Sequence, residues 1–597
     1  MNKPFAAGGP ARKPGRLHAF LRPSDEEGGI VAAAPAIPPL KLARRFWPFA
    51  RPYRRVIAAG LLLVALLPLV QAVEIWLFKE VVDDVIVAGS LDALPWLAGA
   101  VLGLTLLGAL LSFAEDYAWT SAGERFLLDL RGAFFSHLQK LSLDTLDRRR
   151  LGDLIARISG DVQAIEGFVL GGLGEGISAL ARILIFTTAL FVLDWQLALA
   201  VLVLAPPFYF STRYFARLAR HAAREKRRRS GALSAVAEES LANAALVQST
   251  DQGDAERRRF VREGAGVVDA ELASSRIGGA FSGLAALVEV AGVLLVVALG
   301  TWAIEDGRLT VGGLLAFLAY VTQLLRPVSD LGHLASTLLA ASAGGERVLE
   351  LLDRRPEVSD RPGARPLPAV LAGEIELDGV TYSYPGSPEP ALRDVSLRVE
   401  PGEVVALIGP SGGGKSTLAR LLLRFCDPDR GAVRIDGHDL RGVTLGSLRA
   451  NVGTLLQETM LFDASVRDNI AFGAPGAAHE QIVAAARVAN AHDFIEALPD
   501  GYSTRVGQRG RSLSGGQRRR VEVARTLLRD SRVVILDEPT TGLDAGSAAE
   551  LIPALRELLD GRTAIVITHE PELMRAADRV FEISGGRCRE RTVVLSS

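Results

Sequence analysis

The chain's length and composition divide it between two environments. It has 597 residues, of which 49% are apolar and 23% are charged, and its mean hydropathy is +0.24. A chain of this length exceeds what one hydrophobic core supports, so at least two domains are expected. The net charge of −1 gives no electrostatic reason to expect a nucleic-acid partner. Two cysteines exclude a disulfide scaffold or a cysteine-built metal site, and we expect a membrane half and a soluble half.

The first 40 residues differ from everything that follows. Residues 1–40 are rich in Pro, Gly, Ala and Arg and contain no apolar run typical of a secretory signal. An acidic patch, Asp25-Glu26-Glu27, argues against an organellar transit peptide. We predict a disordered cytoplasmic tail.

Residues 41–353 are predicted to form a membrane domain. A helix that crosses a bilayer needs about 20 apolar residues. Such stretches lie at 56–78, 95–115, 170–192, 196–214, 280–303 and 310–328. Only Asp194-Trp195-Gln196 separates the third from the fourth, which indicates a tight turn. Pro206-Pro207 falls inside the fourth, where neighbouring helices are expected to satisfy the carbonyls that a proline frees.

The charges of the connecting loops predict an orientation. The segments 44–55, 125–157 and 213–262 are rich in Lys and Arg, whereas 79–94 and 304–309 contain few. The positive-inside rule therefore places both termini, both long loops and any C-terminal domain in the cytoplasm. The abundance of Arg and Ala is typical of bacterial GC-rich coding, so the expected location is the cell (inner) membrane.

The two long cytoplasmic segments carry helical periodicity. Residues 124–166 and 213–278 read as membrane helices that continue into the cytoplasm, although an independent helical bundle in each loop is the alternative. Their tips, 151–166 and 230–249, are predicted to touch the soluble domain.

Four ionisable residues fall in or near the spans, namely Glu74, Glu175, Arg182 and Glu289. Glu289, the deepest by sequence, reads either as a substrate-cavity carboxylate or as a structural hydrogen-bonding group between helices.

A linker at 354–372, rich in Pro and Arg, precedes a predicted α/β domain at 373–597.

The apolar run VVALIG leads into a G-x-x-x-x-G-K-[ST] motif, which a helical pattern follows. Its members are Gly409, Pro410, Ser411, Gly412, Gly413, Gly414, Lys415, Ser416 and Thr417. Backbone N–H groups of such a loop wrap phosphates, Lys415 is expected on the β- and γ-phosphates of ATP, and Ser416 on Mg²⁺.

A second apolar run, VVIL, ends in Asp537 and Glu538. Asp537 is placed to hold Mg²⁺, and Glu538 to polarise the water that attacks ATP. The alternative, two solvated acids at a strand end, is weakened by the phosphate loop upstream.

A second glycine-rich turn, Ser514-Gly515-Gly516-Gln517, precedes an amphipathic helix and is another phosphate-binding candidate. One nucleotide does not easily engage both glycine-rich turns of one monomer. A head-to-tail dimer can bring this turn onto the ATP of a partner, so a second copy or a second half-transporter is expected.

These motifs, in this order and spacing, resemble the ATP-binding cassette family, and the fused six-span half resembles its half-size exporters over roughly residues 40–590. The resemblance implies that Tyr384 stacks on adenine, Gln457 links membrane contact to Mg²⁺, Asp544 forms the D-loop and His569 is the switch histidine near the γ-phosphate. Gln508 and Glu570 depart from the exporter pattern, in which Glu is common at the first position and Arg at the second. Neither change removes a catalytic group.

The resemblance implies export driven by ATP hydrolysis through alternating access. A drug or a lipid, hydrophobic or amphipathic, is the expected substrate. Export of peptides, glutathione conjugates or siderophores, and an ATP-gated membrane regulator, remain alternatives. The fused membrane half argues against a nucleic-acid-acting ATPase, and against importers, which usually keep the two parts on separate chains.

Overall fold

A computed structural model describes residues 38–89, 91–147, 149, 151–203 and 205–591. Contacts divide the chain into two compact units. The helical unit contains residues up to Leu138 and Leu151–Asp353, and the sheet unit contains Gln139–Arg150 and the residues from Arg354 onward. The predicted tail lies outside the described residues except for its last three positions.

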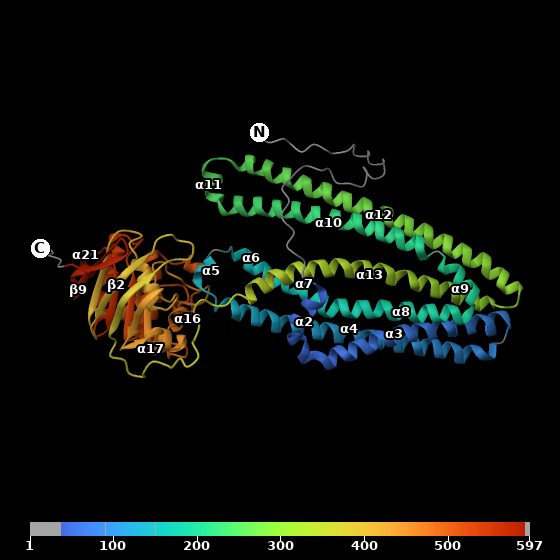
Figure 1. Ribbon diagram of the computed structural model, residues 1–597, viewed down its shortest axis with the longest axis horizontal. Coiled ribbons are helices and arrows are strands. Elements are labelled where there is room, and N and C mark those ends of the chain that lie inside the picture. The colour runs from blue at the N-terminus through green and yellow to red at the C-terminus, as the bar shows by residue number, and fades with distance from the viewer. Residues whose placement is uncertain (1–37, 90, 148, 150, 204, 592–597) are drawn as a thin grey trace, which may run out of the picture. The chain divides into compact units, whose positions relative to one another are not determined.

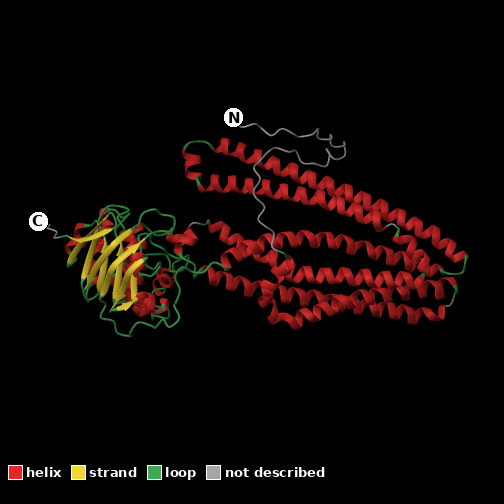
Figure 2. Ribbon diagram, in the orientation of Figure 1, coloured by secondary structure: helices red, strands yellow, loops and turns green. Residues whose placement is uncertain are grey.

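The helical unit is built from long helices (Figures 1 and 2). Its α-helices are α2 (Pro39–Ala50), α3 (Arg54–Glu80), α4 (Leu94–Leu138), α6 (Leu151–Ala156), α7 (Val162–Glu166), α8 (Gly172–Leu193), α9 (Trp195–Leu202), α10 (Ala205–Ala242), α11 (Ala244–Ser249), α12 (Gly253–Glu305) and α13 (Val311–Leu352). Helical turns of other types join them, among them Val81–Val87, Arg157–Asp161 and Gly167–Gly171.

Two sets of helices make up this unit. Helices α3, α4, α8 and α13 pack on one another, while α10 and α12 run side by side as a long hairpin closed by α11 (Figure 1). Buried aromatic residues on α8 and α13, Phe186, Phe317 and Tyr320, centre one apolar cluster. The long helical extension predicted for 213–278 is confirmed by α10 and α12.

Apolar helices long enough to cross a membrane are present in the helical unit. Within the described residues, four stretches meet that length and composition: 41–87, 91–138, 151–193 and 253–305. A shorter apolar stretch, Val311–Leu324, lies in α13. The predicted span at 196–214 includes residue 204, which lies outside the described residues, so the count of six spans stays a prediction.

The turn between the third and fourth predicted spans forms as expected. Asp194 is extended and caps α9, because its carboxylate accepts hydrogen bonds from the backbone N–H groups of Gln196 and Leu197, both at 2.9 Å. The expectation for Pro206-Pro207 is wrong. Helix α10 begins at Ala205, so both prolines stand in its first turn, where the N–H groups that proline lacks have no helical partner in any case.

The sheet unit contains two sheets with helices around them (Figure 2). An antiparallel sheet has the order β2-β1-β4-β5, from β1 (Ile375–Tyr382), β2 (Leu392–Val399), β4 (Arg430–Ile435) and β5 (His438–Asp439). The second sheet has the order β10-β9-β3-β8-β7-β6, from β3 (Val404–Ile408), β6 (Val452–Leu455), β7 (Val533–Asp537), β8 (Thr563–Ile567), β9 (Arg579–Ser584) and β10 (Arg587–Glu590). Its helices are α5 (Leu143–Asp147), α14 (Lys415–Leu422), α15 (Leu445–Asn451), α16 (Val466–Ala471), α17 (His479–Val488), α18 (His492–Glu496), α19 (Gly515–Arg529), α20 (Ala545–Leu559) and α21 (Pro571–Arg575).

The order of the second sheet explains why distant motifs meet. Strands β3, β8 and β7 are neighbours, pair in parallel and are buried on both faces, as their continuous apolar sequences predict. The carboxyl ends of parallel strands lie at one edge of a sheet, where ligands bind. The phosphate loop, Asp537-Glu538 and His569 follow these three strands and therefore share that edge.

Candidate nucleotide-binding site

The phosphate loop connects β3 to α14 in a conformation that requires glycine. Gly409, Gly412 and Gly414 have φ of 143°, 77° and 112°, which side-chain-bearing residues rarely adopt. A Cβ at Gly409 or Gly413 would also lie against the carbonyl oxygen of Ile583. Because the loop is this tight, its backbone N–H groups can approach a phosphate closely. The geometry therefore fits the triphosphate chain of ATP.

Lys415 occupies the interior of the loop. Its side chain is buried, and its ammonium group donates hydrogen bonds to the carbonyl oxygens of Gly409 at 2.7 Å and Pro410 at 3.1 Å. A buried cation held at the start of α14 suits a phosphate group, because the helix dipole adds positive potential there.

Ser416 and Asp537 come together across the site. The Ser416 hydroxyl donates to a carboxylate oxygen of Asp537 at 3.4 Å. Burial raises the pKa of Asp537, and the neighbouring Glu538 carboxylate also raises that pKa, while the Ser416 hydrogen bond lowers it. Hydroxyl and carboxylate oxygens are the ligands that Mg²⁺ prefers, so these two residues fit the predicted metal site.

Glu538 is held by two side chains. Gln457 donates from its amide nitrogen to a Glu538 carboxylate oxygen at 3.2 Å, and the Thr541 hydroxyl donates to the same oxygen at 3.0 Å. Glu538 has φ of 46°, a left-handed backbone conformation that costs about 1–3 kcal/mol and is typical of functional sites. The structure thus joins Gln457 to Glu538, while the roles of both residues stay predictions.

The Tyr384 ring lies beside the phosphate loop. Its hydroxyl is 3.0 Å from the hydroxyl of Thr417, and the Arg420 guanidinium lies 5.9 Å from the ring centroid. The side chain is half-buried, which leaves part of it accessible to a ligand. Stacking on adenine stays a prediction, as does the role of His569, which follows β8 and is exposed.

The second glycine-rich turn is a helix cap. The Ser514 hydroxyl accepts a hydrogen bond from the backbone N–H of Gln517 at 3.2 Å, and the Gln517 side chain accepts one from the N–H of Ser514 at 2.9 Å. Asp544 caps α20 in a similar way through Ser547, and these hydrogen bonds lower the pKa of its carboxyl. In the described part of the chain, no hydrogen bond joins residues 514–517 to the phosphate loop.

A basic cavity of about 450 Å³ opens beside this turn. Four arginines line it together with Gly515 and residues 457–459 and 541–543; they are Arg509, Arg511, Arg518 and Arg519. Gln508 lies in the short helical turn Gln508–Gly510 at the edge of this region, and Glu570 precedes α21. Neither departure from the exporter pattern removes a contact described above.

A short segment from the membrane half is part of the sheet unit. Residues 139–150 belong to this unit, whereas the contact expected between 151–166 or 230–249 and the soluble domain stays a prediction. Asp144 on α5 forms an ion pair with Arg420 at 3.0 Å. Arg157, by contrast, bonds within the helical unit to the Arg347 carbonyl at 2.8 Å and to Glu350. No pattern in the sequence indicates this, because a short helix between two longer ones has too few turns for periodicity.

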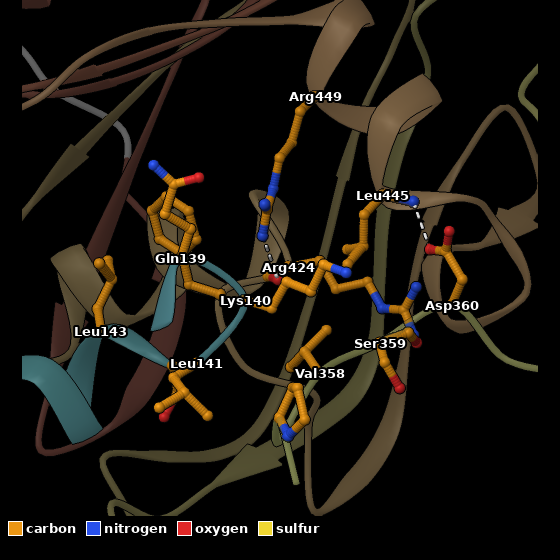
Figure 3. Close-up of a pocket in the computed structure, with 13 residues that line it drawn as sticks. Gln139, Lys140, Leu141, Leu143, Val358, Ser359, Asp360, Arg424, Leu445 and Arg449 are labelled. Atoms are coloured by element: carbon orange, nitrogen blue, oxygen red, sulfur yellow. Dashed lines mark hydrogen bonds between the residues drawn. The ribbon is translucent and has the colours of Figure 1, made fainter. Parts of the chain in front are cut away.

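Residues 139–143 also line a cavity of about 410 Å³ in the sheet unit (Figure 3). Arg424, 1% exposed, donates to the carbonyl oxygens of Val443 at 2.9 Å and Ser359 at 3.2 Å. Arg449 lies next to Arg424 and donates to its carbonyl oxygen at 3.5 Å, and Asp360 accepts from the N–H of Leu445 at 2.7 Å. The cavity thus brings the segment between α4 and α6 together with the predicted linker and the residues after α14.

Two residues near Glu538 were missed. Thr541 follows it by three positions, a spacing that could have indicated a hydroxyl returning to the carboxylate. Arg519 donates to the Glu538 carbonyl oxygen at 3.2 Å, but within the run Arg518-Arg519-Arg520 nothing marks it as buried. In the helical unit, Glu289 on α12 and Glu175 on α8 are exposed, so their roles stay predictions.

Comparison with known proteins agrees with this geometry. Residues 57–328 match the ABC transporter transmembrane region, and residues 392–541 match the ABC transporter domain. The chain therefore belongs to the ATP-binding cassette (ABC) transporter family, with the half-size exporter organisation of one transmembrane region followed by one cassette. It is a membrane protein and an ATPase of the kind that couples ATP hydrolysis to transport.

The relatives include exporters of different cargo. The chain is 32% identical over 551 residues to an ATP-dependent lipid A-core flippase of Syntrophus aciditrophicus, covering 92% of this chain and 91% of the flippase. It is 35% identical over 537 residues to a multidrug efflux ATP-binding/permease protein of Mycobacterium bovis, covering 89% of this chain and 43% of that protein. The solved structure of a bacterial Atm1-family ABC exporter with ATP bound is similar with a TM-score of 0.75 and 30% identity, over 90% of this chain and 95% of the exporter.

Proposed function

We propose that this chain is one half of an exporter that moves a hydrophobic or amphipathic substrate, a drug or a lipid, across the cell (inner) membrane. The observation that carries the proposal is the fusion of an apolar helical unit to a cassette whose phosphate loop, Asp537-Glu538 pair and Gln457 converge at one sheet edge. The kinship with a lipid flippase and a multidrug efflux protein supports this substrate class.

The proposed chemistry is positioning combined with electrostatic stabilisation. Ser416 and Asp537 would hold Mg²⁺, with Gln457 nearby, and a bound ion would neutralise charge on the phosphates of ATP. Glu538 orients the attacking water and accepts its proton, while Lys415 and His569 stabilise the charge on the transferred phosphoryl group. No covalent intermediate with the protein is needed.

A second subunit completes each ATP site in this proposal. The turn at 514–517 caps its own helix and has no hydrogen bond to the described phosphate loop, so its free N–H groups suit the ATP held by a partner. A homodimer is the simplest arrangement, and both of its sites would retain the proposed catalytic groups. A heterodimer with another half-transporter is the alternative.

Alternating access follows from that dimer. ATP closes the two cassettes in the cytoplasm, and segments such as 139–150 transmit the movement to the membrane helices. The cavity then changes from inward-facing to outward-facing, and hydrolysis separates the cassettes again.

The test is transport by purified protein in proteoliposomes. ATP-dependent flipping of a labelled lipid or uptake of a fluorescent drug, abolished by Glu538→Gln, is the expected result. A parallel screen in nanodiscs for stimulated ATPase compares lipids and drugs with peptides, glutathione conjugates and siderophores. Passive flux that ATP gates without accumulation would contradict pumping and identify a regulator.

A further inference from the structure

Arg519 lies at the junction of three functional segments. It is 2% exposed and stands in the second turn of α19, the helix that begins at the turn Ser514–Gln517. Its guanidinium donates to three main-chain carbonyl oxygens: those of Leu456 at 2.6 Å, Gln457 at 3.0 Å and Glu538 at 3.2 Å. It thereby links the helix of the second glycine-rich turn to the backbone of both Gln457 and Glu538.

Glu522 neutralises this buried cation. It is 5% exposed, lies one turn further along α19, and accepts from Arg519 at 2.8 Å. A buried guanidinium is tolerated only when it is paired and its donors are used, and both conditions are met here. The planar fork of arginine can hold several carbonyl oxygens in fixed directions, which a flexible lysine cannot do.

We propose that Arg519 is a positioning residue that couples the two ATP sites of the dimer, an inference that rests on the proposed function. Gln457 and Glu538 belong to the chain's own ATP site, whereas the turn at the start of α19 serves the site of the partner. Because one guanidinium fixes both, movement of α19 on the partner's ATP shifts the backbone that carries Gln457 and Glu538. Neither Arg519 nor Glu522 touches ATP.

The arginine next in sequence provides a matched control. Arg520 lies on the same helix, but it donates to the Asn490 carbonyl at 2.9 Å, pairs with Glu550 at 3.2 Å and stacks over Phe494. It reaches neither Gln457 nor Glu538. Replacing Arg520 by Met removes a positive charge from α19 but leaves the hydrogen bonds of Arg519 in place.

The decisive variant replaces both partners of the buried pair. R519M alone leaves Glu522 buried and unpaired and can fail to fold, whereas R519M/E522M exchanges the pair for apolar side chains of similar length, which proteins often tolerate. We expect its melting temperature to stay within about 2 °C of the parent. Its kcat for ATP is expected to fall about 10²-fold, because small misplacement of catalytic groups has this effect.

The KM for ATP and the cooperativity distinguish positioning from simple stabilisation. Because the phosphate loop is untouched, KM should change less than about twofold. We expect a Hill coefficient for ATP above 1 in the parent and a decrease to about 1 in the double variant. R520M should match the parent in kcat, KM and Hill coefficient. R519K should show a smaller loss than the double variant, but still fall short of the parent.

Hydrogen exchange gives a readout that needs no activity. The double variant, in the full-length chain, should exchange faster in peptides that contain residues 456–459 and 538–541, and R520M should not. A folded double variant with parental kcat, Hill coefficient and exchange would overturn the inference, as would equal losses of kcat, ATP affinity and melting temperature. If the parent chain hydrolyses no ATP, the proposed function fails, and the exchange result alone decides whether Arg519 holds these segments.

Discussion

The two units of this protein use polar side chains in opposite ways. In the sheet unit, distant polar groups converge at the carboxyl ends of three buried strands, where Ser416 contacts Asp537 and Gln457 contacts Glu538. In the helical unit, large apolar side chains such as Leu102, Leu106 and Phe113 of α4 are exposed. Exposed apolar faces of this extent indicate a lipid environment. Polar groups that converge indicate the reaction at a site, whereas an exposed apolar surface does not identify the transported substrate.

The largest effect is expected in the sheet unit, at the proposed base. Glu538→Gln should lower phosphate release roughly 10²- to 10⁴-fold, because general-base catalysis contributes that much. ATP-bound dimers should accumulate, as size-exclusion chromatography with trapped nucleotide can show. Glu570→Gln is the control, since Glu570 contacts Thr568 only through its backbone N–H. Normal turnover by Glu538→Gln would assign the base elsewhere.

A second substitution tests the tightness of the phosphate loop. Gly409→Ala should destabilise the cassette by about 3 kcal/mol or more, because strain at positive φ adds to the clash with Ile583. Gly412 also has a positive φ, 77°, but open space around its Cβ, so Gly412→Ala should lose less stability. Thermal unfolding and the KM for ATP measure both. Equal losses in the two variants would show that the close approach to Ile583 does not matter.

A third prediction concerns a polar contact in the helical unit. Asp194 caps α9 and pairs with Arg308 at 3.1 Å, with only 4% of its side chain exposed. Asp194→Ala should cost about 1–2 kcal/mol of stability, the usual value of a helix cap. The melting temperature in detergent should fall while the ATPase activity of the folded protein is retained. Asp306→Ala, which removes a longer and more exposed contact to Arg308, should have little effect. A large loss of ATPase activity in folded Asp194→Ala would contradict a purely structural role.

The smallest effect is expected in segment 139–150, which lies between two helices of the helical unit but belongs to the sheet unit. Asp144→Asn weakens the partly exposed ion pair with Arg420, so the transport per ATP hydrolysed should change by less than about fivefold, the equivalent of about 1 kcal/mol. High salt should reduce the difference from the parent. The exposed Asp147 on the same helix supplies the control, Asp147→Asn. A complete loss of transport would show that this contact matters far more than an exposed ion pair allows.

The two-part organisation and most of the candidate ATP site can be predicted from the amino-acid sequence. Apolar runs that end in glycines or carboxylates predict buried strands, with Lys415 and Asp537 at or just beyond the carboxyl ends of two of them. Long apolar stretches likewise predict membrane helices, because a bilayer demands their length. These features depend on local composition and order along the chain, which a sequence displays directly.

The neighbours that hold those residues become visible only in the folded protein. Arg519 looks like one solvated arginine among three, and its burial depends on how α19 packs against strands that lie elsewhere in the chain. Segment 139–150 belongs to the sheet unit, where Asp144 meets Arg420, a partner 276 positions away. Pro206 stands in a first turn because α10 begins there, not because neighbouring helices compensate. Such contacts are set by packing between distant segments, for which neither periodicity nor motif spacing carries a signal.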